Sequence, residues 1–142
     1  MKYTFACLAI SGLMLAACGG AGGDSALQAD CKILAGDPEA LENFEEMGTD
    51  AEGFCDCFIK VVNAKPETEQ AQMKSALERV TDGMEETGQG AEDVVGPMMR
   101  EIMLESSQAG EESDLGAGIR LIGQAIDEIG EGFEDGGSCP VA

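Results

Sequence analysis

From residue 24 onward, apolar residues recur three or four positions apart, which is the spacing of one face of an α-helix. The most regular run lies near the C-terminus, at intervals of 4, 3, 4, 3 and 4: Leu115, Ile119, Ile122, Ile126, Ile129 and Phe133. No segment shows the alternating, β-branched pattern of a strand. The sequence therefore predicts an all-α fold, a small bundle of about five helices.

Prolines, glycines and capping residues divide this pattern into segments. Asp37-Pro38-Glu39 has the order of an N-cap, a first-turn proline and an acid near the positive end of the helix dipole. Thr49 is followed three residues later by Glu52, which predicts a capping box for the next helix. A further helix is expected to begin at Pro66 and to end before Gly88-Gln89-Gly90.

The segment after Gly90 carries a predicted apolar face, which Pro97 either precedes as a helix start or interrupts as a kink. This face consists of Val94, Val95, Met98, Met99 and Ile102. In the last helix, Gly116, Gly123 and Gly130 recur every seven residues along one edge of the apolar stripe. Each glycine inside a helix lowers its stability by about 1 kcal/mol relative to alanine. Their alignment predicts a close helix crossing, within the chain or in a homodimer.

The first residues have a different pattern. Lys2 precedes a short apolar run ending in Leu15-Ala16-Ala17-Cys18, as in a secretory signal. The run is shorter than the roughly 20 residues of a membrane span. The motif resembles the lipobox of bacterial lipoproteins, a resemblance that covers only about the first 18 residues. It implies cleavage before Cys18, which then carries the lipid anchor. Gly19 follows instead of the aspartate that favours the inner membrane, so the resemblance implies the outer membrane, facing the periplasm.

Three parts follow from this division. Residues 1–17 are expected to be the signal peptide, residues 18–24 the lipidated cysteine with a glycine-rich tether, and residues 25–142 the helical domain. The tether is short, so it holds the domain near the membrane surface of the cell envelope. Removal of residues 1–17 leaves 125 of the 142 residues, the size of one domain.

Four cysteines remain once the signal peptide and the lipidated cysteine are set aside: Cys31, Cys55, Cys57 and Cys139. In an oxidising compartment, an even number predicts structural disulfides, here two. Cys55 and Cys57 lie about 200° apart on a helix, so a bond between them would require the helix to break. Each should reach a different partner. Two pairings remain open, 31–55 with 57–139 and 31–57 with 55–139.

The chain is strongly acidic, with 28 acidic against 8 basic residues and a formal charge of −20. Without Lys2 this becomes 7 against 28, or −21. Such a surface repels nucleic acids and anionic headgroups, so attachment to the membrane is expected through the lipid on Cys18. An envelope protein or a second copy of the chain is the expected partner.

No catalytic set is evident. Histidine is absent, which excludes Ser-His and Cys-His nucleophiles, and no phosphate-binding glycine loop is present. We therefore expect a non-enzymatic binding or structural role, with no metal and no cofactor. One alternative is a copper(I)-handling lipoprotein that uses Cys55, Cys57 and methionines, since copper(I) prefers sulfur ligands. The second is a hydrolase that depends on a single carboxylate.

Overall fold

The computed structural model describes residues 21–141, and the side chains of residues 24–141. This part of the chain is all-α and contains no strand. The prediction of a small helical bundle is confirmed, with six helices instead of about five: α1 (Ala21–Ala35), α2 (Pro38–Met47), α3 (Ala51–Ala64), α4 (Glu67–Thr87), α5 (Ala91–Ala109) and α6 (Asp114–Gly136).

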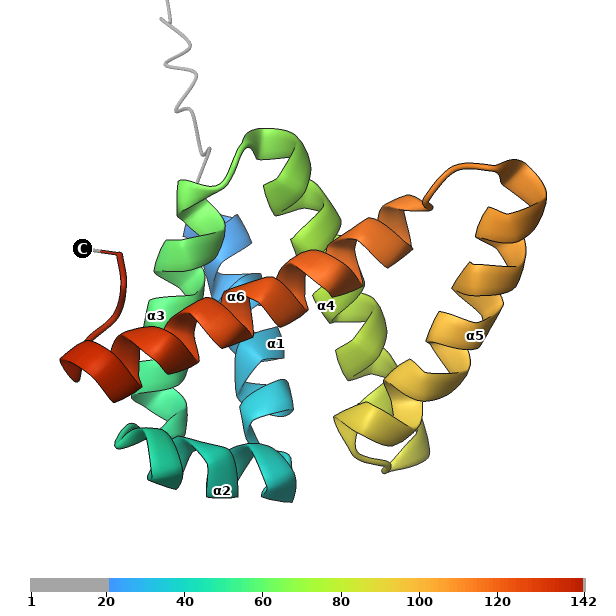
Figure 1. Ribbon diagram of the computed structural model, residues 1–142. Helices are drawn as coiled ribbons and strands as arrows, with labels where there is room; N and C mark the ends of the chain where they lie inside the picture. The colour runs from blue at the N-terminus through green and yellow to red at the C-terminus, as the bar shows by residue number, and fades with distance from the viewer. Residues whose placement is uncertain (1–20, 142) are drawn as a thin grey trace, which may run out of the picture.

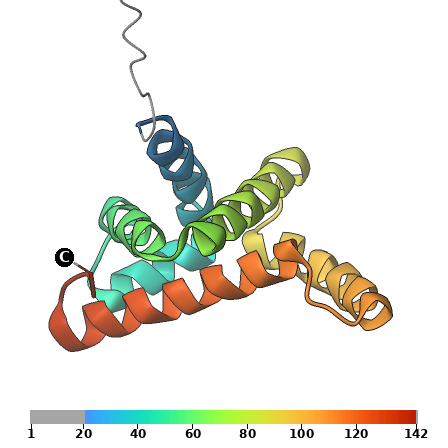
Figure 2. The ribbon, with the colours of Figure 1, turned by 90° about the horizontal axis from the view of Figure 1, so that it is seen from above.

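The long helix α6 lies across one face of the other helices (Figure 1). Behind it, α1 packs against both α3 and α4. α6 makes its most extensive contact with α4 and a smaller one with α3, and its C-terminal half also touches α2. Seen from above, α5 extends beyond the end of this arrangement, next to the start of α6 (Figure 2). α5 therefore has the fewest neighbours among the longer helices.

Capping residues fix the ends of α2 and α3. Asp37 caps α2 as predicted, with its Oδ1 accepting a hydrogen bond of 2.9 Å from the amide of Glu39. The predicted capping box at Thr49 is wrong. Asp50 is the N-cap of α3 and accepts a 2.8 Å hydrogen bond from the amide of Gly53. Both residue types cap helices well, and the carboxylate one position later takes the role.

Helix α1 begins at Ala21, so it includes the last four residues of the segment expected to be a tether. Asp24 lies in its first turn, where a carboxylate interacts favourably with the helix dipole. The expected signal peptide and the expected lipidation site, Cys18, lie outside the described residues. The division into residues 1–17, 18–24 and 25–142 stays a prediction.

The centre of the core is formed by α3 and its neighbours. Phe44 of α2 stacks on Phe54 of α3, with 4.5 Å between ring centroids, and Phe58 follows one turn later. The apolar face of α3, made by Phe54, Phe58, Val61 and Val62, is buried in full. Burial of such side chains contributes roughly 1.5–3 kcal/mol each, so this face is a major source of stability.

Two disulfides join this core to the ends of the domain. Cys31 of α1 is bonded to Cys55, with 5.7 Å between their Cα atoms. Cys57 is bonded to Cys139 in the C-terminal tail, with 5.5 Å between Cα atoms. Of the two pairings that the sequence left open, the structure selects the first. Cys55 and Cys57 leave α3 on different sides, as the helical wheel predicts.

The close crossing of α4 and α6 lies at Gly118, a glycine that the seven-residue spacing did not indicate. A Cβ atom added to Gly118 would lie 2.7 Å from the Cβ of Ala76 and 2.9 Å from the carbonyl carbon of Gln72. At Gly123 an added Cβ would meet nothing within 4 Å. A close helix crossing is therefore found within the chain, but its tightest point is Gly118. Within the predicted row, an added Cβ at Gly116 would lie 2.8 Å from Cγ2 of Ile102 in α5, whereas Gly123 is open.

Candidate functional site

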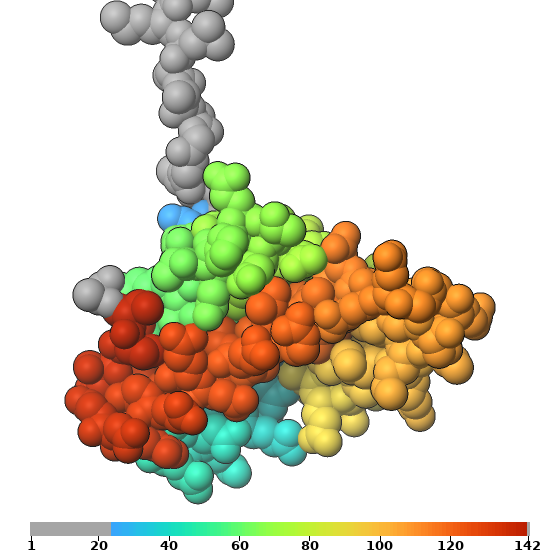
Figure 3. All heavy atoms as spheres, turned by 45° about the horizontal axis from the view of Figure 1, so that its top comes forward, coloured from blue at the N-terminus to red at the C-terminus, as the bar shows by residue number. Residues whose placement is uncertain are grey.

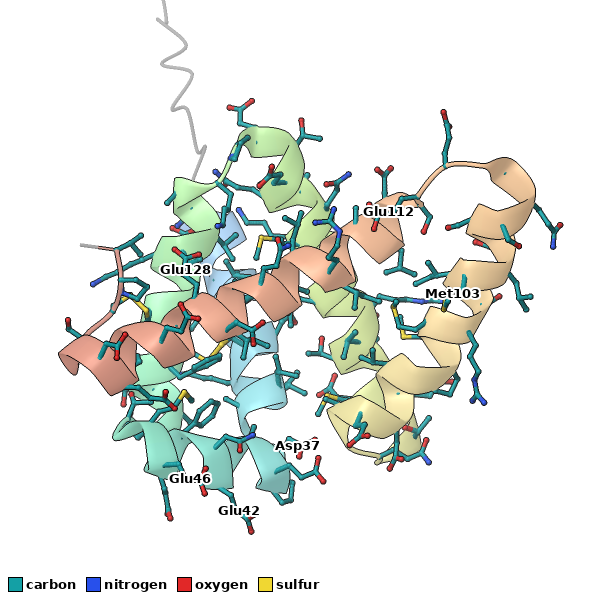
Figure 4. All side chains as sticks on the ribbon, viewed as in Figure 1. Asp37, Glu42, Glu46, Met103, Glu112 and Glu128 are labelled. Atoms are coloured by element: carbon teal, nitrogen blue, oxygen red, sulfur yellow. A yellow bond between two sulfur atoms is a disulfide. The ribbon has the colours of Figure 1, made fainter. Side chains whose placement is uncertain are left out.

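The apolar face of α5 is only partly covered. Val94 and Ile102 are buried against the rest of the domain, whereas Val95, Met98 and Met99 are half-buried. Met103 and Leu104 are 67% and 64% exposed, and Figure 4 shows Met103 on this helix. The sequence predicts this face as core, but α5 has too few neighbours to bury it. An apolar surface is left open between α5 and α6.

An apolar groove follows the edge of α6 that faces α2 and α5. It consists of three successive cavities, which we call the α6 groove. The middle cavity, of about 270 Å³, lies between α6 and the start of α5, over Leu77 and Val80 of α4. Its α6 wall consists of Ile119, Ile122, Gly123 and Ile126. Figure 3 shows α6 across this face, with α2 in teal and the start of α5 in yellow along its lower edge.

The other two cavities extend the groove at both ends. Toward α2, a cavity of about 260 Å³ is lined by Ala40, Phe44 and Met47, and it shares Leu34 and Ile126 with the middle one. Toward the α5–α6 turn, a wider cavity of about 770 Å³ lies between Met99, Ile102 and Met103 of α5 and Gly116 and Ile119 of α6. The wide cavity shares Ile119 with the middle one, so the three cavities follow one another along α6.

The dimensions of the α6 groove suit an elongated apolar ligand. From Gly116 to Ile126, α6 advances about 15 Å, or nearly three helical turns. Ligand sites typically enclose about 300–1,000 Å³ and are lined mainly by apolar side chains with a few polar groups. The α6 groove has this composition, and its polar groups lie at the rim.

The rim of the α6 groove is acidic. Five carboxylates line the three cavities: Asp37, Glu39, Glu92, Glu111 and Glu112. The one basic lining residue, Arg120, donates from Nε and Nη2 to the two carboxylate oxygens of Glu112, each at 3.2 Å. Its charge is therefore matched within the chain, and the other four carboxylates have no basic partner among the described residues.

Acidic groups are also crowded where α1 packs against α4. The pKa of the Asp30 carboxyl is raised by burial, and further by the charges of Glu78, Asp82 and Glu85. Within residues 24–141, only two ion pairs offset the acidic surface, Lys65–Glu128 and Arg120–Glu112. Repulsion between carboxylates is therefore a general feature of this surface. The α6 groove is an apolar region within it.

Asp37 joins two helices at the α2 end of the groove. While its Oδ1 caps α2, its Oδ2 accepts a hydrogen bond of 2.8 Å from the amide of Ala91, the first residue of α5. The side chain is only 8% exposed. A Cβ on the adjacent Gly90 would lie 2.8 Å from Oδ2, so glycine is needed for this approach. One carboxylate thus holds the starts of α2 and α5 together.

We expect Asp37→Asn to lower the free energy of unfolding by about 1–3 kcal/mol, because the side-chain amide keeps one acceptor and turns an NH₂ group toward the half-buried backbone amide of Ala91. Chemical unfolding followed by far-UV circular dichroism measures this loss.

Asp50→Asn is the matched control, because it removes the same charge at an exposed cap that uses a single oxygen. Asparagine caps helices about as well as aspartate, so the change should stay within about 0.5 kcal/mol. Equal losses in both variants would contradict the double role of Asp37.

The predicted site residues fall into separate groups. All four of the remaining cysteines are consumed by disulfides, which leaves Cys55 and Cys57 without thiolates for copper(I). Met73 and Met84 are buried in the core, and Met99 and Met103 line the groove. Among residues 24–141, no three Cys, Asp or Glu side chains come together in a way that could hold a metal ion. Cys18 lies outside the described residues.

Sequence reasoning missed the α6 groove itself. The signal that points to it is the pair Met99 and Met103, one helical turn apart, facing a last helix whose Gly123 has open space in front. No helix among the described residues is both long enough and apolar enough to cross a membrane.

A scan against protein-family models, a search of curated proteins and a search of solved structures found no match to this chain. The role of the α6 groove therefore has to be inferred from its own shape and charge.

Proposed function

We propose that this chain is a lipid-anchored, non-enzymatic binding module of the bacterial cell envelope, which holds an apolar segment of another envelope protein in the α6 groove. The observation that carries this proposal is the groove, an open apolar surface about three helical turns long on a strongly acidic domain. Contiguous apolar surfaces with polar rims are typical of interaction sites on small proteins.

The position of the groove supports this role. Helix α1 begins three residues after Cys18, and its 15 residues span about 22 Å to the start of α2. An anchor on Cys18 would thus place the membrane beyond the N-terminal end of α1, and the α2 end of the groove on the far side (Figure 1). Two disulfides support an oxidising compartment such as the periplasm.

Two side-chain arrangements favour binding over the alternative chemistries. The disulfides occupy the cysteines that copper(I) would use. Asp37, the one buried carboxylate among the described residues, already binds two backbone amides, which favours a structural role over acid–base catalysis.

A photoreactive amino acid in place of Gly123, in the full chain expressed in the native host, should crosslink to one discrete envelope protein. Gly123 is exposed and lines the middle of the α6 groove, so a side chain there reaches whatever the groove holds. Crosslinked products are identified by mass spectrometry after membrane fractionation.

The same amino acid at Ala71, which is exposed on α4 and lines none of the three cavities, provides the control. Cys18→Ser should release the protein from the membrane fraction and remove the crosslink. Identical products from positions 71 and 123, or none from either, would contradict a binding role for the groove.

A further inference from the structure

We propose that the segment held by the α6 groove is a basic amphipathic helix of a partner protein. Its apolar face would lie on α5 and α6, and its lysine and arginine side chains would face the acidic rim. This inference rests on the proposed function and adds the chemistry of the partner.

The charge at the groove is the first argument. Glu39 and Glu92 flank the α2 end, both exposed and each in the first turn of its helix, and Glu111 flanks the other end. Arg120 is already bound to Glu112, and no lysine or arginine of residues 24–141 forms an ion pair with Glu39, Glu92 or Glu111. A partner with lysine or arginine at both ends of the groove would form ion pairs with these carboxylates. Complementary charge would also accelerate association.

The shape of the groove is the second argument. A helix binds in a groove through apolar residues at positions i, i+3 or i+4, and i+7, which span about 10 Å. The wall from Gly116 to Ile126 is about 15 Å long and accommodates this set. Gly123 presents no side chain, and an added Cβ would meet nothing within 4 Å, so a partner helix can approach the backbone of α6 there. Met99 and Met103 on the facing wall adapt readily to different apolar side chains.

The acidic rim also argues against two other occupants of the groove, a second copy of the chain and an anionic lipid. A second copy would bring another formal charge of −20 and a second acidic rim against the first. The acyl chain of an anionic lipid would place its headgroup at one end of the groove, beside Glu39 and Glu92 or beside Glu111, and these carboxylates repel it. A cationic helix is attracted where these two are repelled.

The test uses a fluorescent peptide of leucine and lysine, about 14 residues long, with leucines at i, i+3, i+4 and i+7. Binding to the oxidised full chain in zwitterionic nanodiscs is measured by anisotropy, with empty nanodiscs as the blank. A scrambled peptide of the same composition should bind at least about tenfold more weakly, because it presents no apolar face.

Two double variants distinguish the effect of the rim carboxylates on peptide binding from the effect of the net charge. Glu39→Lys with Glu92→Lys should weaken peptide binding about tenfold or more. Glu42→Lys with Glu46→Lys changes the net charge equally on the outer side of α2, where Figure 4 shows both side chains pointing away from α6. This control should change binding several-fold less than the rim pair, because neither Glu42 nor Glu46 lines a cavity of the groove.

A third variant keeps the inference testable if lysine at the rim unfolds the domain. Gly123→Gln places a side chain in the open strip of α6 without altering charge, and should weaken binding about tenfold while leaving the melting temperature equal or higher.

Equal binding of the amphipathic and scrambled peptides would overturn the inference, as would equal effects of the rim and outer pairs. A dimer or a bound fatty acid that Gly123→Gln displaces would overturn it too, in favour of that occupant.

A crosslinked envelope protein without a basic helix at the contact would refute this inference and leave the proposed function standing. Peptide binding without any crosslink from position 123 would refute the proposed function alone.

Discussion

Replacing Gly118 with alanine should lower the free energy of unfolding by about 2–4 kcal/mol. The added methyl group would lie 2.7 Å from the Cβ of Ala76 and 2.9 Å from the carbonyl carbon of Gln72, closer than side-chain atoms pack. Because one of these neighbours is backbone, α4 and α6 have to move apart along the most extensive helix contact of the domain. Urea unfolding at equilibrium measures the loss.

Gly123→Ala is the matched control, since it makes the same change in the same helix five residues away. With nothing within 4 Å of the new methyl group, only helix propensity acts, and stability should rise by about 1 kcal/mol. The two alanines thus have opposite expected signs. A gain in stability at position 118 would mean that α4 and α6 do not cross as closely as described.

Removing the disulfide between Cys57 and Cys139, by changing both residues to serine, should destabilise the domain by about 3–5 kcal/mol. The bond closes a loop with a sequence separation of 82 residues, which includes all of α4, α5 and α6. In the chain-entropy treatment, a loop of this length contributes about 4.5 kcal/mol at 25 °C. Thermal unfolding of the double variant, compared with the oxidised parent, measures the effect.

The disulfide between Cys31 and Cys55 provides the comparison, because its sequence separation is only 24 residues. The same treatment gives about 3.4 kcal/mol for its removal, so the 57–139 variant should be the less stable of the two. The reversed order would show that packing lost around Cys31 and Cys55, both fully buried, outweighs loop entropy. Reduction of the parent protein should destabilise it more than either double variant.

Local chemistry made the helices predictable. Proline and glycine interrupt the 3.6-residue pattern, and the predicted cap at Asp37 holds. At the start of α6, Ser113 caps the helix by accepting a hydrogen bond from the amide of Gly116. The cap of α3 was misplaced by one residue because Thr49 and Asp50 have similar capping ability. Such choices depend on the exact backbone angles at the helix start, which the sequence pattern does not contain.

Contacts between helices were less predictable, and the α6 groove depends on them. The apolar pattern of α5 is the same whether a neighbouring helix covers it or not, so Met98 and Met99 were expected in the core. The choice of Gly118 over Gly116 and Gly123 as the crossing point depends on how α6 is rotated against α4. The pairing of the cysteines likewise depends on which side of α3 faces α1.

The observed pairing also has a consequence for how the bonds form. Among the cysteines of residues 21–141, the first is joined to the second and the third to the fourth. A chain that is oxidised as it emerges with its N-terminus first therefore obtains its native bonds by linking cysteines in order of appearance. Reshuffling of mispaired disulfides takes seconds to hours and needs an isomerase to be fast. Consecutive pairing would let such a chain reach its native bonds without an isomerase.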